Sequence, residues 1–119
     1  PDVIISIETF EHIPRESAST LLYNFKNTCK KDGIIIITTP RRRTESFIYT
    51  GGTHKYEYSV NEFKEEISRV FSNYLMYYAI EFTHPASSEL NTVFTSLHEW
   101  SDKAAVLICI IQNNEAQPQ

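Results

Sequence analysis

The sequence predicts an α/β fold in which short buried strands alternate with helices. Two observations carry this prediction. Val3–Ile7 and residues 34–37 are apolar runs rich in β-branched residues, the pattern of strands covered on both faces of a sheet. A stretch with apolar residues at helical spacing follows each run. Strands and helices that alternate in this way are expected to give parallel strands joined by right-handed crossovers.

The first helix is expected between Pro14 and Gly33. The fixed φ of proline suits a first helical turn, and its missing N–H is not needed there. Two lysines before Gly33 favour a helix C-terminus, and the glycine ends the helix. The predicted buried stripe consists of Ala18, Leu21, Leu22, Phe25 and Cys29.

The second helix has a stronger start signal. Ser59 and Glu62 have the spacing of a capping box, in which each side chain bonds the backbone N–H of the other residue. Tyr58 and Phe63 fit the hydrophobic staple that often accompanies it. We therefore expect this helix to begin directly after Ser59.

The last part of the chain is expected to add two strands, at residues 74–82 and 103–111. The sequence between them holds no convincing long helix, only a candidate short helix at 90–98. These two strands are therefore predicted to pair antiparallel as a hairpin. Residues 113–119 are expected to form a flexible tail after a domain portion spanning 1–112.

Composition narrows the function classes. The chain has 119 residues, a net charge of −4 and a pI near 5.5, which oppose a nucleic-acid-binding surface over the whole protein. The longest apolar runs are too short to span a membrane, and no signal peptide is visible. Cys29 and Cys109 lie inside apolar patterns without metal-like spacing. We expect buried thiols in a cytoplasmic protein.

Polar side chains gather where the first strand ends. Glu8, Glu11 and His12 follow Val3–Ile7 at spacing i, i+3, i+4, which places them on one face of a helical turn. Ligands of open parallel sheets bind at the carboxyl ends of the strands. Two carboxylates and an imidazole could hold a divalent cation, with His54 of the later loop as a further ligand. Alternatively, the acids cap the following helix and His12 packs beneath the loop.

Three segments in order resemble the second half of class I S-adenosylmethionine-dependent methyltransferases. They are DVIISIETFEHIP with its strand ending in E-x-x-E-H, KKDGIIIITTP with its strand ending in T-P, and HKYEYS before a helix. The resemblance covers roughly residues 2–71. It implies a partial Rossmann-like methyltransferase sheet made of the last four strands, the final two an antiparallel hairpin, with flanking helices and a missing N-terminal half.

The resemblance also implies roles for individual residues. Ser6, Ile7 and Glu8 would touch the methionine end of S-adenosylmethionine, and His12 would serve as general base. The E-x-x-E-H element resembles that of ubiquinone-pathway O-methyltransferases and of small-RNA terminal 2′-O-methyltransferases. In those groups it binds a divalent metal, so Glu8, Glu11, His12 and His54 are candidate ligands for Mg or Mn.

Departures from the family pattern limit the expected activity. The glycine-rich loop and the acidic residue that hold most of the cofactor are absent, and none of the three glycines forms G-x-G. The turn before the second strand has one glycine, and Arg41 follows T-P where the family commonly has Asn. A chain of this kind is expected to be inactive without the N-terminal half.

The sequence leaves three functional interpretations open. The first is a methyltransferase fragment that O-methylates a small hydroxylated substrate, with Arg41, Arg43 and Tyr56 as substrate contacts. The second is a non-catalytic half-domain that assembles with a second copy, or with a separate N-terminal half, through its open sheet edge. The third is a metal-dependent RNA terminal 2′-O-methyltransferase. The alternative reading, which the residue types favour, makes the arginine run a solvated loop and the tyrosines core or staple contacts.

Overall fold

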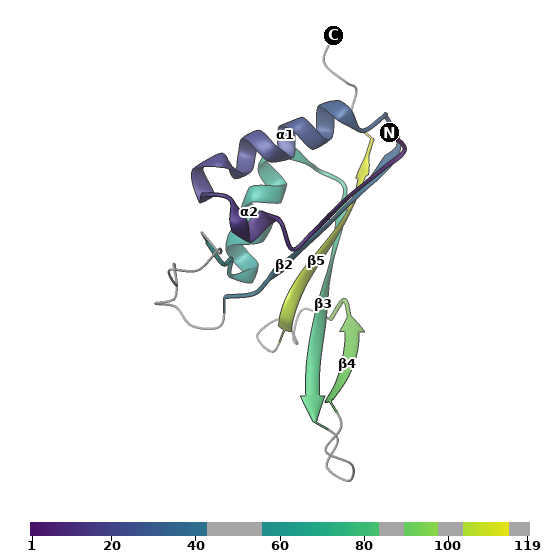
Figure 1. Cartoon of the computed structure of the whole chain (residues 1–119). Coiled ribbons are helices and arrows are strands. Elements are labelled where there is room, and N and C mark those ends of the chain that lie inside the picture. Colours follow the sequence, from purple (N-terminus) through teal and green to yellow (C-terminus); the bar gives the residue numbers. More distant parts are fainter. Residues whose placement is uncertain (43–55, 84–89, 98–103, 115–119) are drawn as a thin grey trace.

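A computed structural model describes residues 1–42, 56–83, 90–97 and 104–114. These residues form a five-stranded mixed sheet in the order β1-β2-β5-β3-β4, with two α-helices beside it (Figure 1). The predicted α/β fold class is therefore confirmed. No helix in these ranges has the length and apolar character needed to cross a membrane.

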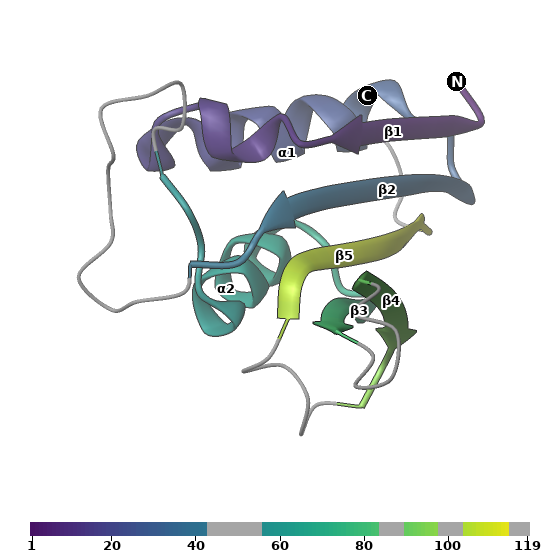
Figure 2. The same cartoon turned by 60° about the horizontal axis from the view of Figure 1, so that its bottom comes forward.

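Three strands of the sheet run in the same direction. β1 (Val3–Ile7) pairs in parallel with β2 (Gly33–Pro40), as the alternating pattern predicted. β5 (Ala104–Asn113) pairs antiparallel with β2 on one side and with β3 (Tyr74–Thr83) on the other. β3 consequently has the direction of β1 and β2, although β5 lies between β2 and β3 (Figure 2).

The C-terminal part differs from the prediction in its connections. β3 and β5 do pair antiparallel, but they are not a hairpin, because a further strand precedes β5. The expected short helix at 90–98 is wrong: β4 (Leu90–Thr95) is a strand that pairs antiparallel with β3. Three of its six residues, Thr92, Val93 and Thr95, are β-branched, which suits a strand beside the open edge of β3.

β5 also extends further than expected. Its last residue, Asn113, is buried, and its side-chain amide donates to the carbonyl oxygens of Lys26 at 3.0 Å and Cys29 at 2.9 Å. Asn113 therefore belongs to the folded domain. The prediction that a flexible tail begins at residue 113 is therefore wrong for Asn113, and residues 115–119 lie outside the described part of the chain.

The two α-helices follow the predicted pattern with shifted ends. α1 (Ala18–Thr28) begins later than expected, because residues 15–17 form a 3₁₀ turn after Pro14. α2 (Val60–Val70) begins as predicted. The hydroxyl of Ser59 accepts from the N–H of Glu62 at 3.2 Å, and the Glu62 carboxylate accepts from the N–H of Ser59 at 3.0 Å. The capping box is confirmed.

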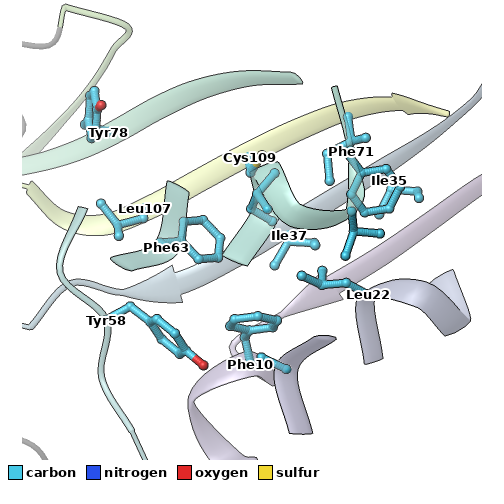
Figure 3. Close-up of a cluster of buried hydrophobic side chains, with 14 of the residues drawn as sticks. Phe10, Leu22, Ile35, Ile37, Tyr58, Phe63, Phe71, Tyr78, Leu107 and Cys109 are labelled. Carbon is cyan, nitrogen blue, oxygen red and sulfur yellow. The ribbon is translucent and has the colours of Figure 1, made fainter. Parts of the chain in front are cut away.

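The core lies between the helices and one face of the sheet (Figure 3). Its aromatic part centres on Phe10, whose ring centroid lies 5.1 Å from that of Tyr58 and 5.5 Å from that of Phe63. The Tyr58–Phe63 contact confirms the predicted staple. Cys29 and Cys109 are buried and form no disulfide, as expected.

The other face of the sheet carries apolar side chains that no described element covers. Val3, Ile5 and Ile7 of β1 are 50%, 59% and 62% exposed. The prediction that β1 is buried on both faces is therefore wrong for the described residues. The physical reason is visible in Figure 1, where α1 and α2 lie on the same side of the sheet.

Candidate functional site

The carboxyl ends of β1 and β2 meet at one edge of the sheet because the two strands are parallel. The backbone N–H of Glu8 joins them, since it is 3.2 Å from both the carbonyl oxygen and the side-chain oxygen of Thr38. Glu8 has a φ of 52°, a left-handed conformation that is uncommon for a residue other than glycine. Such backbone strain is often found where a chain positions functional groups.

The turn after β1 gives the three predicted site residues different exposure to solvent. Residues Phe10–His12 form a single 3₁₀ turn, and the buried ring of Phe10 fixes that turn against the core. Glu11 is completely buried, whereas Glu8 and His12 are exposed. The three residues are neighbours as predicted, but they do not present one common face to solvent.

The carboxyl group of Glu8 is influenced by burial and by Glu11. Partial burial raises the pKa of Glu8 to about 7, and a hydrogen bond to Glu11 and its like charge contribute in the same direction. The charge of His12 opposes this rise. The Nε2 atom of His12 lies 3.9 Å from a carboxylate oxygen of Glu11. The turn thus combines two carboxyl groups, one of which changes charge near neutral pH, with an imidazole.

The predicted metal site finds no support in the described residues. Within them, no three His, Cys, Asp or Glu side chains come together in a group that could hold a metal ion. His54, the fourth candidate ligand, lies outside the described residues. We therefore derive no chemical step through a metal.

The candidate cofactor residues lie at the end of β1 with alternating side chains. Ser6 is buried on the helix-covered side, and its hydroxyl has no hydrogen-bond partner among the described residues. Ile7 points to the opposite, uncovered face. Of these three residues, only Glu8 has an exposed polar side chain, so the backbone of residues 6–8 and the carboxyl group of Glu8 are what a ligand would meet there.

The three consecutive arginines Arg41–Arg43 include two that the structure describes, and both make specific contacts. The Nε atom of Arg41 donates to the carbonyl of Ala104 at 2.6 Å. The side chain of Arg42 is only 8% exposed, and its Nη1 lies 3.1 Å from a carboxylate oxygen of Glu62. The solvated-loop interpretation is therefore wrong for Arg42. Arg43 lies outside the described residues, and the substrate role of Arg41 stays a prediction.

Tyr56, the third predicted substrate contact, belongs to a charged network. Its hydroxyl donates to the carboxylate of Glu62 and accepts from Arg15 at 2.8 Å and Arg42 at 3.3 Å. Arg15 also donates to Glu62 at 3.0 Å. The network ties the turn before α1 to the start of α2. The predicted contact of Tyr56 with a substrate also stays a prediction. Any such contact would come in addition to the structural role of Tyr56 in this network.

The sequence does not predict the contacts of three residues that hold the segments of the site together. Arg15, Thr38 and Glu62 hold the turn, the strand end and the later segment in place. The sequence pattern predicts Glu62 only as a capping residue. Its pairing with Arg15 spans 47 positions, and no local pattern could have revealed it.

No protein-family description and no curated protein matches this sequence. Solved structures do match. One is a SAM-dependent methyltransferase of Thermotoga maritima, described as a possible histamine N-methyltransferase, with a TM-score of 0.67 and 14% identity over 94% of this chain and 55% of that chain. Another is a SAM-dependent methyltransferase of Archaeoglobus fulgidus, with a TM-score of 0.64 and 15% identity over 93% of this chain and 58% of that chain.

This chain therefore spans little more than half the length of the solved chains that it matches. At such low identity the likeness establishes the fold and leaves the reaction open. The mixed sheet and the helices beside it are those of the class I fold of S-adenosylmethionine-dependent methyltransferases.

Proposed function

We propose that this chain is the C-terminal portion of a class I S-adenosylmethionine-dependent methyltransferase domain, and that it O-methylates a small hydroxylated substrate. The observation that carries the proposal is the acid–acid–histidine turn at the carboxyl end of a parallel strand, within the fold of known methyltransferases. Ligands of such sheets bind at this edge.

The residues at the end of β1 would hold the methionine end of the cofactor, whose sulfonium supplies an electrophilic methyl group. The exposed carboxyl group of Glu8 can accept hydrogen bonds from a cationic amine such as the α-amino group of a methionine. The backbone groups of Ser6 and Ile7 lie beside it. Their buried or apolar side chains make the backbone the more suitable contact.

His12 would accept the proton that methyl transfer releases. In the proposed step, the substrate oxygen forms a bond to the methyl carbon as the carbon–sulfur bond breaks, and the hydroxyl proton passes to the imidazole. His12 suits this role because it is exposed and is held beside the buried carboxyl group of Glu11. Positioning of the two reactants would supply most of the acceleration.

The decisive experiment measures transfer of a labelled methyl group to a panel of small phenols and catechols. We expect no transfer by this chain alone, because it lacks the glycine-rich cofactor loop. With the polypeptide encoded directly upstream we expect transfer, which His12→Gln should slow about 10²- to 10⁴-fold. Activity of the chain alone, or transfer only to amines, would refute the proposal.

A non-catalytic half-domain is the second candidate. It is favoured by the structural contacts that already occupy Arg41 and Tyr56, two of the predicted substrate residues. An assembled complex that does not bind S-adenosylhomocysteine would support it. The metal-dependent RNA methyltransferase has less support, because the described residues hold no three-ligand group and Arg42 is paired with Glu62.

A further inference from the structure

β4 forms the outer edge of the described sheet on the side away from β1. No described strand pairs with its outer edge. Because backbone groups alternate along an antiparallel strand, every second residue of β4 directs its N–H and C=O groups to this open edge. The family resemblance implied four strands, and β4 is the additional one in the described sheet. The open edge of β4 is therefore not a feature that the resemblance predicts.

The sequence of β4 has none of the features that usually protect an edge strand. Natural edge strands avoid pairing with other chains through a charge, a proline or a bulge. Residues 90–97, LNTVFTSL, include no charged residue, no proline and no glycine. β4 pairs with β3 in unbroken register from Leu90 to Thr95, without a bulge. Its outer edge can therefore accept a further strand.

The side chains of β4 are exposed on both faces of the sheet. Val93 lies beside Ile80 on one face and is 45% exposed. Phe94 lies beside Ala79 on the other face and is 66% exposed, more than any other large apolar side chain of the described residues. Figures 1 and 2 show the reason, since α1 and α2 lie beside the other part of the sheet and do not reach β4.

The segment is complementary to a second copy of itself. Two antiparallel strands place residues of the same hydrogen-bonding class opposite each other, so in a two-fold pair of identical strands one residue lies opposite its own copy. A register centred on Phe94 brings the two exposed rings together and places Val93 opposite Thr95 of the other copy. Aromatic pairs and pairs of β-branched residues stabilise antiparallel strands, and no charges oppose each other in this register.

We propose that β4 is a dimerisation strand, which pairs antiparallel with β4 of a second copy around a two-fold axis at Phe94. The two described sheets then become one continuous sheet. The row formed by Val106 of β5, Ala79 of β3 and Phe94 of β4 continues into the same row of the other copy. The paired edges are short, so we expect a reversible dimer whose fraction rises with protein concentration.

Other occupants fit this edge less well. Pairing of β4 with β1 of another copy would be heterologous and would leave an open edge at each end, so assembly would not close. A foreign strand gains its specificity from pockets that receive alternate side chains. Val93 and Phe94 instead project as exposed side chains, and the flat apolar counterpart that they need is supplied by the same residues of a second copy.

The proposed dimer is independent of the proposed function. β4 and β1 are at opposite ends of the strand order, so the pairing leaves the candidate site at the end of β1 accessible in both copies. Loss of the dimer would not affect the assignment of a methyl-transfer reaction, and absence of methyl transfer would not affect the dimer.

The test is sedimentation equilibrium of the 119-residue chain over a range of concentrations. Phe94→Lys places two like charges opposite each other at the axis and should weaken dimerisation at least about tenfold. Leu75→Lys is the matched control, because Leu75 is 60% exposed on the same face but belongs to β3. It should leave dimerisation unchanged. Circular dichroism of each variant shows whether it remains folded.

The position of the axis is tested by mixing Phe94→Lys with Phe94→Glu. Each variant alone should be largely monomeric, whereas the mixture should form dimers, because opposite charges then face each other at the axis. In the unmodified chain, hydrogen exchange of alternate β4 amides should slow as concentration rises. The proposal is overturned if the chain is monomeric at every concentration, if no β4 amide gains protection, if Leu75→Lys weakens the dimer as much as Phe94→Lys, or if the mixture does not dimerise.

Discussion

The backbone N–H of Tyr56 donates a hydrogen bond to the carbonyl of Glu11, 3.2 Å away. This bond joins the turn after β1 to the segment that begins α2, although the two residues are 45 positions apart. The hydroxyl of Tyr56 continues the connection through Glu62 to Arg15 and Arg42. The position of the candidate site therefore depends on a network outside it.

Removing the hydroxyl of Tyr56 tests that dependence. Tyr56→Phe should lower the free energy of unfolding by about 1–2 kcal/mol, because charged partners lose a hydrogen bond in a partly buried position. Urea unfolding measures the change. Tyr23→Phe, on the exposed side of α1, is the matched control and should change stability by less than about 0.5 kcal/mol. Equal effects of the two variants would show that the network contributes nothing specific.

Glu62 should make stability depend on pH in the acid range. Burial opposes its charge, but the hydrogen bonds from Tyr56 and Ser59 and the charge of Arg42 outweigh burial and lower its pKa. A lowered pKa in the folded state contributes stability above the ordinary pKa of a glutamate and loses it as pH falls through the folded value. Glu62→Gln should therefore cost about 1–3 kcal/mol at pH 7 and progressively less below about pH 4.5.

The control for this experiment is Glu65→Gln, since Glu65 is exposed and lies 3.9 Å from the same Arg15. Its effect should stay within about 0.5 kcal/mol at all pH values. Urea unfolding at pH 7 and pH 3.5 supplies both comparisons. A cost for Glu62→Gln that is the same at the two pH values would contradict the predicted ionisation.

Glu8 should affect stability in the opposite direction. Its pKa is raised to about 7, so the folded protein binds a proton there that the unfolded chain has already lost at the same pH. Stability should consequently fall as pH rises from about 4.5 to 7, and Glu8→Gln should remove this dependence. NMR titration of the Glu8 side-chain carboxyl carbon measures the pKa directly. A midpoint near 4.5 would contradict the described contact with Glu11.

Gly33 is predicted to tolerate no side chain. A Cβ atom there would lie 2.6 Å from the sulfur of Cys29, 2.8 Å from the carbonyl oxygen of Asp2 and 2.9 Å from that of Lys30. Gly33→Ala should therefore cost about 2 kcal/mol in urea unfolding. Cys29→Ala in the same chain removes only the sulfur contact, so it should recover part of this loss in a double-mutant cycle. If Gly33→Ala left the free energy of unfolding unchanged, the backbone around Asp2 and Lys30 would have to be able to move and make room for the methyl group.

Much of the fold could be predicted because local signals agree with the tertiary structure. The β-branched runs, the capping box of Ser59 and Glu62 and the order of strands and helices all appear in the structure. β4 was missed because its six residues carry no clear period, and its pairing with β3 is a tertiary contact. The exposure of Ile5 could not be predicted either, since an apolar run alone does not tell which elements will cover it.

The candidate site was predictable in position more than in geometry. Spacing placed Glu8, Glu11 and His12 together at the end of β1. It could not indicate the left-handed conformation of Glu8 or the short 3₁₀ turn, because both depend on Thr38 and on the packing of Phe10. These tertiary contacts bury Glu11 and leave His12 exposed, so the expected metal ligands differ in their access to solvent.

The most direct measurement of the central claim is calorimetric titration of S-adenosylhomocysteine into the assembled complex of this chain with the upstream polypeptide. If the end of β1 holds the methionine portion of the methyl donor, the complex should bind one equivalent, and Glu8→Ala should weaken binding at least about tenfold. Glu16→Ala, at an exposed position before α1, should leave the affinity unchanged. A folded complex that binds no ligand, or binds it equally well with Glu8→Ala, would contradict the account.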